Sequence, residues 1–137
     1  MQRERFLVKS SGDNEDGARV GLRKLFELAG THKSSVIVVP AFTHIKNSMF
    51  ATVLPEPLAK VLIKDRKVTL DNGHTVELCS QATLKNFQRA DAYLSLWGST
   101  HAVEDVEALT RWTSHILVAW IPADAEKWAQ ANAVQVI

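Results

Sequence analysis

The run "VIVV" at residues 36–39 constrains the fold more than any other feature of this sequence. Its residues are β-branched and favour an extended strand, and no polar residue alternates with them to leave one face for water. Uninterrupted apolar strands of this kind occur mainly in parallel sheets that helices cover on both faces. The runs "AYLSLWG" at 92–98 and "HILVAWIP" at 115–122 have the same apolar character. We therefore expect all three to be strands of one sheet.

Segments with helical periodicity lie between these strands. Apolar residues recur at three- and four-residue spacing over 18–29, 103–109 and 125–129, and Glu107 and Arg111 are spaced for an ion pair one helical turn apart. The segment 43–65 is also predicted to be helical, with a break at its two prolines. Strands that alternate with helices predict an α/β fold with three layers, in which a mostly parallel sheet has a Rossmann-like layout.

The segment "KVTLDNGHTVEL" at 67–78 predicts an antiparallel hairpin at one edge of this sheet. A two-residue turn would pair Val68 with Glu77, whereas a three-residue loop over 71–73 pairs Val68 with Val76. We expect the three-residue loop because it keeps the apolar side chains on one face and places the loop glycine in the left-handed conformation.

Length and composition set the broad class. The 137 residues suffice for a single α/β domain over 1–137, and 46% of them are hydrophobic, as in ordinary globular proteins. No apolar run approaches the roughly 18 residues that a membrane helix requires. Cys79 is the only cysteine, so no disulfide forms within the chain. We expect a cytoplasmic protein with a buried or edge thiol.

Gly12 and Gly17 have the spacing of a phosphate-binding loop between a strand and a helix. Such a loop requires Lys and then Ser or Thr after the second glycine, and here Ala18 and Arg19 follow. Acidic residues between the glycines would also repel a triphosphate. We expect a helix N-cap whose acids complement the helix dipole, with a magnesium site on these acids as the alternative.

Strand polarity sorts the histidines, because the carboxyl ends of parallel strands meet at one edge of a sheet. His44 follows the first of the three apolar strands and His101 follows the second, whereas His32 and His115 lie where strands begin. Asp124 follows the third strand. We therefore expect His44, His101 and Asp124 at the same edge, and we name them as candidate catalytic residues.

Two imidazoles and a carboxylate supply an acid and a base near neutral pH, or ligands for a metal. The sequence itself assigns neither a metal nor a cofactor. The candidate ligand-binding residues beside them are Thr43, Lys46, Gly98, Ser99 and Thr100. The competing interpretation is that the short polar residues and Asp124 only cap helices.

These observations predict a module that binds a small ligand, a nucleotide or another polar metabolite, at the carboxyl edge of the sheet. One alternative is a non-enzymatic protein-interaction or oligomerisation domain, and another is a hydrolase that uses His44, His101 and Asp124. The net charge of +1 does not favour a nucleic-acid partner. The basic run over 60–67 has no interleaved aromatic residue, so a solvated face is favoured over phosphate contacts.

The C-terminal third carries features that favour self-association. All four tryptophans lie in the last 41 residues, at positions 97, 112, 120 and 128. Tryptophan is typical of cores and of interfaces. The terminal segment "AVQVI" at 133–137 is an uncharged candidate edge strand. We expect a homodimer, the commonest oligomer, built on this part of the chain.

Overall fold

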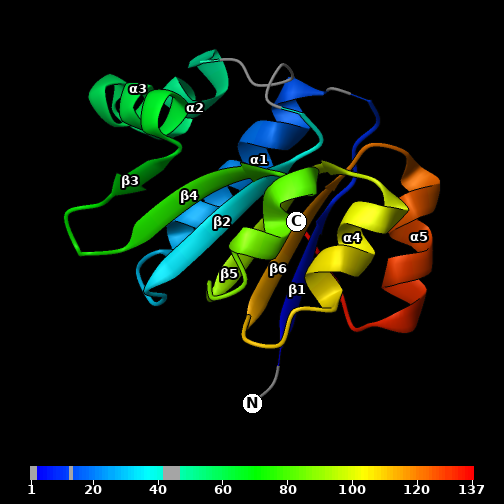
Figure 1. Cartoon of the computed structure of the whole chain (residues 1–137). Coiled ribbons are helices and arrows are strands. Elements are labelled where there is room, and N and C mark those ends of the chain that lie inside the picture. The colour runs from blue at the N-terminus through cyan, green and yellow to red at the C-terminus, as the bar shows by residue number, and fades with distance from the viewer. Residues whose placement is uncertain (1–2, 13, 42–46) are drawn as a thin grey trace.

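The computed structural model describes residues 3–12, 14–41 and 47–137. Helices and strands alternate along most of the chain, as the hydrophobic patterns predict (Figure 1). The strands are β1 (Glu4–Val8), β2 (Ser34–Val39), β3 (Lys67–Thr69), β4 (Thr75–Ser80), β5 (Ala92–Gly98), β6 (Ser114–Ala119) and β7 (Gln135–Val136). The helices are α1 (Glu15–Leu28), α2 (Asn47–Val53), α3 (Glu56–Asp65), the 3₁₀ helix η2 (Gln81–Asn86), α4 (Thr100–Glu107) and α5 (Pro122–Ala131).

Over the described residues, the strands form one seven-stranded sheet in the order β3-β4-β2-β5-β6-β1-β7. All neighbouring pairs are parallel except β3 and β4, which form an antiparallel hairpin at one edge. The mixed, mostly parallel α/β sheet with an edge hairpin confirms the predicted fold class.

Helices cover both faces of the sheet and make the three layers. We call the two sides the α1 face, which α1, α2 and α3 cover, and the α4 face, which η2, α4 and α5 cover (Figure 1). The central strands are buried on both sides: β5 and β6 are buried along their whole length. Such strands carry apolar side chains on both faces rather than on one, which is why the sequence shows nearly continuous apolar runs.

Two local predictions are confirmed at the hairpin and in the helical segment before it. Val68 pairs with Val76, and Gly73 has a φ of +87°, as the three-residue loop requires. The side chain of Asn72 donates to the carbonyl of Ala29 at 3.0 Å and so ties the loop to the end of α1. The predicted helical break lies between α2 and α3, where Pro55 precedes the first residue of α3.

The segment with the glycine spacing of a phosphate loop forms a helix cap, as predicted. The side chain of Asn14 accepts a hydrogen bond from the amide of Gly17 at 3.1 Å, and Glu15 and Asp16 occupy the first turn of α1. This arrangement satisfies an amide that a bound phosphate would otherwise use.

One predicted ion pair is wrong. Helix α4 ends at Glu107, so Arg111 does not lie one turn further along the same helix. Glu107 instead bonds to Arg5 and His115, two residues that lie on neighbouring strands of the sheet. Partners from strands outcompete a pair on an exposed helix face because they compensate a partly buried charge.

No helix in the described part of the chain is long and apolar enough to cross a membrane.

Helix α1 approaches the sheet closely at Gly21. A methyl group placed on Gly21 would lie 2.5 Å from Val118 Cγ2 and 3.1 Å from Leu94 Cδ1. The close packing of α1 against the sheet therefore requires a residue without a side chain at position 21, although glycine is a poor helix former.

We expect Gly21→Ala to lower the free energy of unfolding by about 1–3 kcal/mol, because overpacking outweighs the gain in helix propensity. Urea denaturation measures this change. Gly30→Ala is the control, since its added methyl would meet only a carbonyl oxygen at 3.6 Å, and its effect should stay within about 0.5 kcal/mol. An alanine variant at position 21 as stable as the native chain would contradict the close approach.

Candidate functional site

The predicted residues after β5 and β6 lie at the carboxyl edge of the sheet, where Thr100 and Asp124 bond to each other. Ser99 is the N-cap of α4 and accepts from the amide of Ala102 at 3.4 Å. Thr100 donates to Asp124 Oδ1 at 2.5 Å, which joins the start of α4 to the first turn of α5. His101 is exposed on the first turn of α4. Ser99 therefore acts as a helix cap, and Thr100 joins the two helices through Asp124.

Thr43, His44 and Lys46 lie outside the described residues. The predicted meeting of His44 with His101 and Asp124 therefore stays a prediction.

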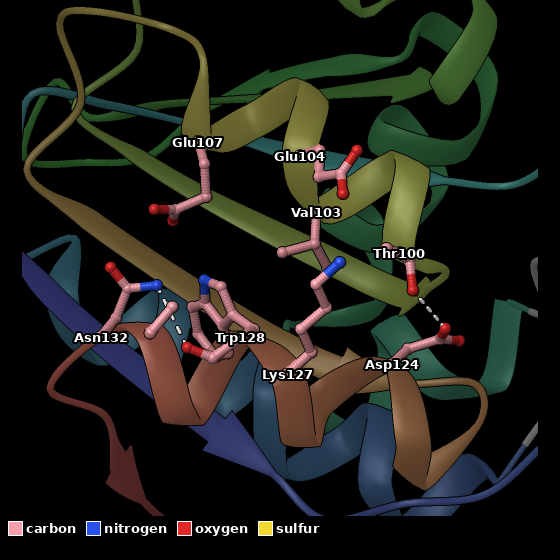
Figure 2. Close-up of a pocket in the computed structure, with 9 residues that line it drawn as sticks. Thr100, Val103, Glu104, Glu107, Asp124, Lys127, Trp128 and Asn132 are labelled. Atoms are coloured by element: carbon pink, nitrogen blue, oxygen red, sulfur yellow. Dashed lines mark hydrogen bonds between the residues drawn. The ribbon is translucent and has the colours of Figure 1, made fainter.

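A narrow cavity of about 220 Å³ lies between α4 and α5 beside these residues (Figure 2). Its walls include Thr100, Val103 and Glu104 from α4 and Lys127 and Trp128 from α5. Figure 2 shows Lys127 extending from α5 toward Val103, and the hydrogen bond from Thr100 to Asp124 at one end. This volume is smaller than the roughly 300 Å³ at which ligand pockets usually begin.

A buried polar network lies beneath α4, and the sequence interpretation missed it. His115 Nδ1 donates to Glu107 Oε2 at 2.8 Å, and His115 Nε2 accepts from the hydroxyl of Ser95 at 2.7 Å. Arg5 donates to Glu107 Oε1 at 2.8 Å. The available signal was a serine within the apolar run of β5 and a histidine within that of β6, since a polar residue inside a buried strand requires a partner.

The order serine, histidine, carboxylate matches the hydrogen bonding of a nucleophile, a base and an orienting acid. Ser95 and His115 nevertheless both have 0% of their surface exposed. No substrate can reach the Ser95 hydroxyl without unpacking the sheet. We therefore interpret the network as a structural element.

Aromatic residues enclose the network. The ring centroids of Trp112 and Trp128 lie 5.6 and 5.2 Å from that of His115, both edge-on, and the Arg3 guanidinium lies 4.0 Å from the Trp112 ring centroid. Trp97, Trp112 and Trp128 are buried in the core. Their burial within one chain explains three of the four tryptophans without an interface.

Burial and hydrogen bonding set the charge states in this network. Burial lowers the pKa of His115, although its bond to Glu107 acts in the opposite direction, so the imidazole is neutral. Burial by itself would raise the pKa of Glu107, but hydrogen bonds from His115 and Arg5 lower it from 4.5 to about 2.

Both shifts make the folded state less stable in acid. An unfolded chain recovers a histidine pKa of about 6.5 and so binds a proton before the folded state does, which lowers stability below that pH. Glu107 contributes stability above its unfolded pKa of 4.5, and this contribution is lost as the pH falls toward 2.

We expect Glu107→Gln to lower the free energy of unfolding at pH 7 by about 2–4 kcal/mol, since it leaves Arg5 and His115 without their carboxylate. The difference from the native protein should shrink between pH 4.5 and pH 2. Denaturant titrations across this range measure it. Glu104→Gln, an exposed acid on the same helix, is the control and should have little effect. A Glu107→Gln deficit that does not change with pH would refute the assigned shift.

The histidines near the strand starts lie at the amino edge, as strand polarity predicts. His32 Nε2 is 3.0 Å from Ser114 Oγ at the start of β6. His74, at the hairpin, is buried, donates from Nδ1 to the carbonyl of His32 at 2.7 Å and accepts from the Ser35 hydroxyl at 2.9 Å. These contacts join the starts of the strands to one another.

Cys79 is not a nucleophile at neutral pH. It is buried in β4, and burial, with the nearby charge of Glu77, raises the pKa of its thiol to about 12. Within the described part of the chain, no three His, Cys, Asp or Glu side chains group closely enough to hold a metal ion.

A larger open space at the carboxyl edge lies beyond β6 and β1. This β1/β6 cavity measures about 830 Å³. The ends of β1 and β6, the N-cap residue of α1 and the first turn of α5 form it, and the rest of α5 and β7 extend it. Its lining comprises Leu7, Lys9, Ser10, Ser11, Asn14, Ala119, Pro122, Ala125, Glu126, Ala129, Gln130 and Val136.

The strand order explains why a cavity opens here. The helix that follows β1 covers the α1 face, whereas the helix that follows the neighbouring strand β6 covers the α4 face. After β1 the chain therefore turns to one face of the sheet, and after the adjacent strand β6 it turns to the other. This divergence creates a crevice outside the carboxyl ends of the two strands. The size of the cavity is in the usual range for small-molecule sites.

Ser10 is a buried polar residue in the lining of this cavity. Its side-chain oxygen is buried and has no hydrogen-bond partner among the described residues. It lies under the first turn of α1, close enough that a methyl on Gly17 would be 2.7 Å from it. A buried hydroxyl without a partner costs free energy unless something bonds to it.

Among the described residues, tryptophans line the neighbouring crevice between β2 and β5. Trp97 adopts a left-handed conformation, with a φ of +56°, at a bulge between Leu96 and Gly98, a backbone state that costs a bulky residue about 1–3 kcal/mol. Of the described residues, Pro40, Trp97, Ser99 and Trp120 leave a cavity of only about 130 Å³ there. The β1/β6 cavity is therefore the better candidate ligand site.

Comparison of the chain with protein-family models, curated proteins and solved structures finds no match. The functional argument therefore depends on the geometry of the chain itself.

Proposed function

We propose that this protein is a small-ligand-binding module whose ligand occupies the β1/β6 cavity. The observation that carries the proposal is the Ser10 hydroxyl, which has no partner among the described residues and lies in a cavity of about 830 Å³. The cavity is at the crevice between β1 and β6, after which the chain turns to opposite faces of the sheet. The edge is the one that the sequence predicts, but the cavity is centred on the ends of β1 and β6, whereas the predicted residues follow β2, β5 and β6.

The lining indicates the class of ligand. Its floor is apolar, with Leu7, Ala119 and Ala125. Of the described residues that line it, Lys9 is the single cation and Glu126 the single carboxylate. Such a site suits a polar metabolite with an apolar body, such as a nucleoside or an aromatic amino acid.

The first turn of α1 makes a triphosphate a poor ligand. The Asn14 side chain already bonds to the amide of Gly17, and Glu15 and Asp16 add negative charge beside it. Within the class of nucleotides, the cavity therefore favours the base and sugar over a phosphate chain.

We expect Ala129→Phe to abolish binding, because Ala129 lines the cavity and is half-buried, so a phenyl group there fills the space. Ala123→Phe, exposed on the same helix and not part of the lining, is the matched control. Ser10→Ala should weaken binding by about two- to tenfold, the value of one hydrogen bond. The probes are adenosine, uridine, their monophosphates and phenylalanine.

Protein NMR titrations follow the amides of Ser10, Ser11 and Ala129. Saturable shifts at these amides that Ala129→Phe removes and Ala123→Phe preserves would support the proposal. An affinity that Ala129→Phe leaves unchanged would count against the proposal, as would the absence of any shift with these probes at millimolar concentration.

Self-association is a second candidate function, and β7 favours it. This strand pairs with β1 on one side only and forms an edge of the sheet. Val136 is 53% exposed there. An edge strand without charged side chains offers free backbone groups to a second copy. The hydrolase alternative has less support, since the Asp124 carboxylate bonds to Thr100 and His44 lies outside the described residues.

If β7 joins two copies, the native protein should be a dimer at micromolar concentration, and Val136→Lys should make it monomeric because a charged edge residue opposes strand pairing. Light scattering measures both. Val61→Lys, which replaces an exposed valine on α3, is the control and should remain dimeric. A native mass near 15.2 kDa would exclude the dimer.

A further inference from the structure

A second hollow lies at the opposite end of the sheet and has a different chemical character. This amino-edge groove measures about 510 Å³. Its floor is the α4 face of β2, β4 and β3, and its wall is the end of η2 with the segment that leads to β5. The lining comprises Ser34, Val36, Lys67, Thr75, Glu77, Lys85, Asn86, Phe87, Gln88, Arg89 and Ala90.

Three cations from two separate segments line this groove. Lys67 begins β3, whereas Lys85 and Arg89 lie on η2 and on the segment after it. All three are exposed. Within the part of the chain that the structure describes, none of them forms an ion pair, whereas Arg5, Arg19, Lys24 and Lys60 do. Like charges gathered in one hollow repel one another unless an anion lies between them.

The charges in the groove indicate the charge of the ligand that would fit it. Glu77, directly across the strands from Lys67, is the one acid among the described residues of the lining. Three cations and one acid leave an excess of about two positive charges, which matches the charge of a phosphate monoester near neutral pH. Arginine and lysine are also the side chains that recognise phosphate most directly.

The other lining residues suit the organic part of such a ligand. Val36, Phe87 and Ala90 supply apolar surface, and Ser34 and Thr75 supply hydroxyls. The volume accommodates a sugar phosphate or a mononucleotide. We propose that the amino-edge groove binds a small phosphate monoester through Lys67, Lys85 and Arg89. This site is independent of the β1/β6 cavity.

The test is an NMR titration with AMP and with ribose 5-phosphate, each compared with its phosphate-free counterpart, adenosine or ribose. Shifts should occur at residues 85–89 and at Thr75. The double variant Lys85→Ala/Arg89→Ala should weaken the binding of AMP and ribose 5-phosphate by about tenfold or more, because two charge-assisted contacts are lost. Arg23→Ala/Lys64→Ala removes the same charge from exposed positions on α1 and α3 and should change affinity less than about twofold.

The same titrations on the Ala129→Phe protein separate the two proposals. A groove that binds both phosphates in this background supports the inference whether or not the β1/β6 cavity binds a ligand. Three outcomes would overturn the inference. Adenosine could bind at residues 85–89 as tightly as AMP, or the Lys85→Ala/Arg89→Ala protein could bind AMP as tightly as the Arg23→Ala/Lys64→Ala control does. The third outcome is that neither AMP nor ribose 5-phosphate causes a shift at millimolar concentration and low salt.

Discussion

The carboxylate of Glu107 is the charge around which the α4 face is organised. It is mostly buried, so it must be compensated, and Arg5 from β1 and His115 from β6 supply the donors. His115 in turn accepts from Ser95 on β5. One acid at the end of α4 thus connects three neighbouring strands and fixes where that helix lies on the sheet.

The position of α4 determines the carboxyl edge. With its last residue held over β1 and β6, its first residues reach the end of β5, where Ser99 caps the helix and Thr100 bonds to Asp124 of α5. Helix α5 is therefore held beside α4 and forms one wall of the β1/β6 cavity. The network beneath α4 and the wall of the β1/β6 cavity are thus in contact with the same helix pair.

The two ends of the sheet offer different chemistry. At the carboxyl edge, tryptophans line the described part of the crevice between β2 and β5, and the crevice between β1 and β6 is open, apolar at its floor and has one cation and one acid in its lining. At the amino edge, histidines and serines join the strand starts, and the adjoining groove is cationic. The near-zero net charge of the chain does not reveal this difference, because it sums charges over the whole sequence, whereas the amino-edge groove gathers three cations against one acid.

The sequence by itself determined the elements whose causes are local. Continuous apolar runs identified β2, β5 and β6, the two prolines placed the helical break, and the loop glycine set the pairing of Val68 with Val76. Strand polarity also placed His32 and His115 at the amino edge. These follow from side-chain period and backbone geometry, which a few neighbouring residues specify.

Only the tertiary structure decided which strands are neighbours. Residues 4–8 lie between β6 and β7, so Arg5 meets Glu107 over a separation of 102 residues and Arg111 is left without the pairing that local spacing predicts. The same strand order opens the β1/β6 cavity, and the packing of η2 against β2 and β4 places Lys85 and Arg89 in one groove with Lys67. Strand order depends on how all the helices pack over both faces at once, and no local pattern records it.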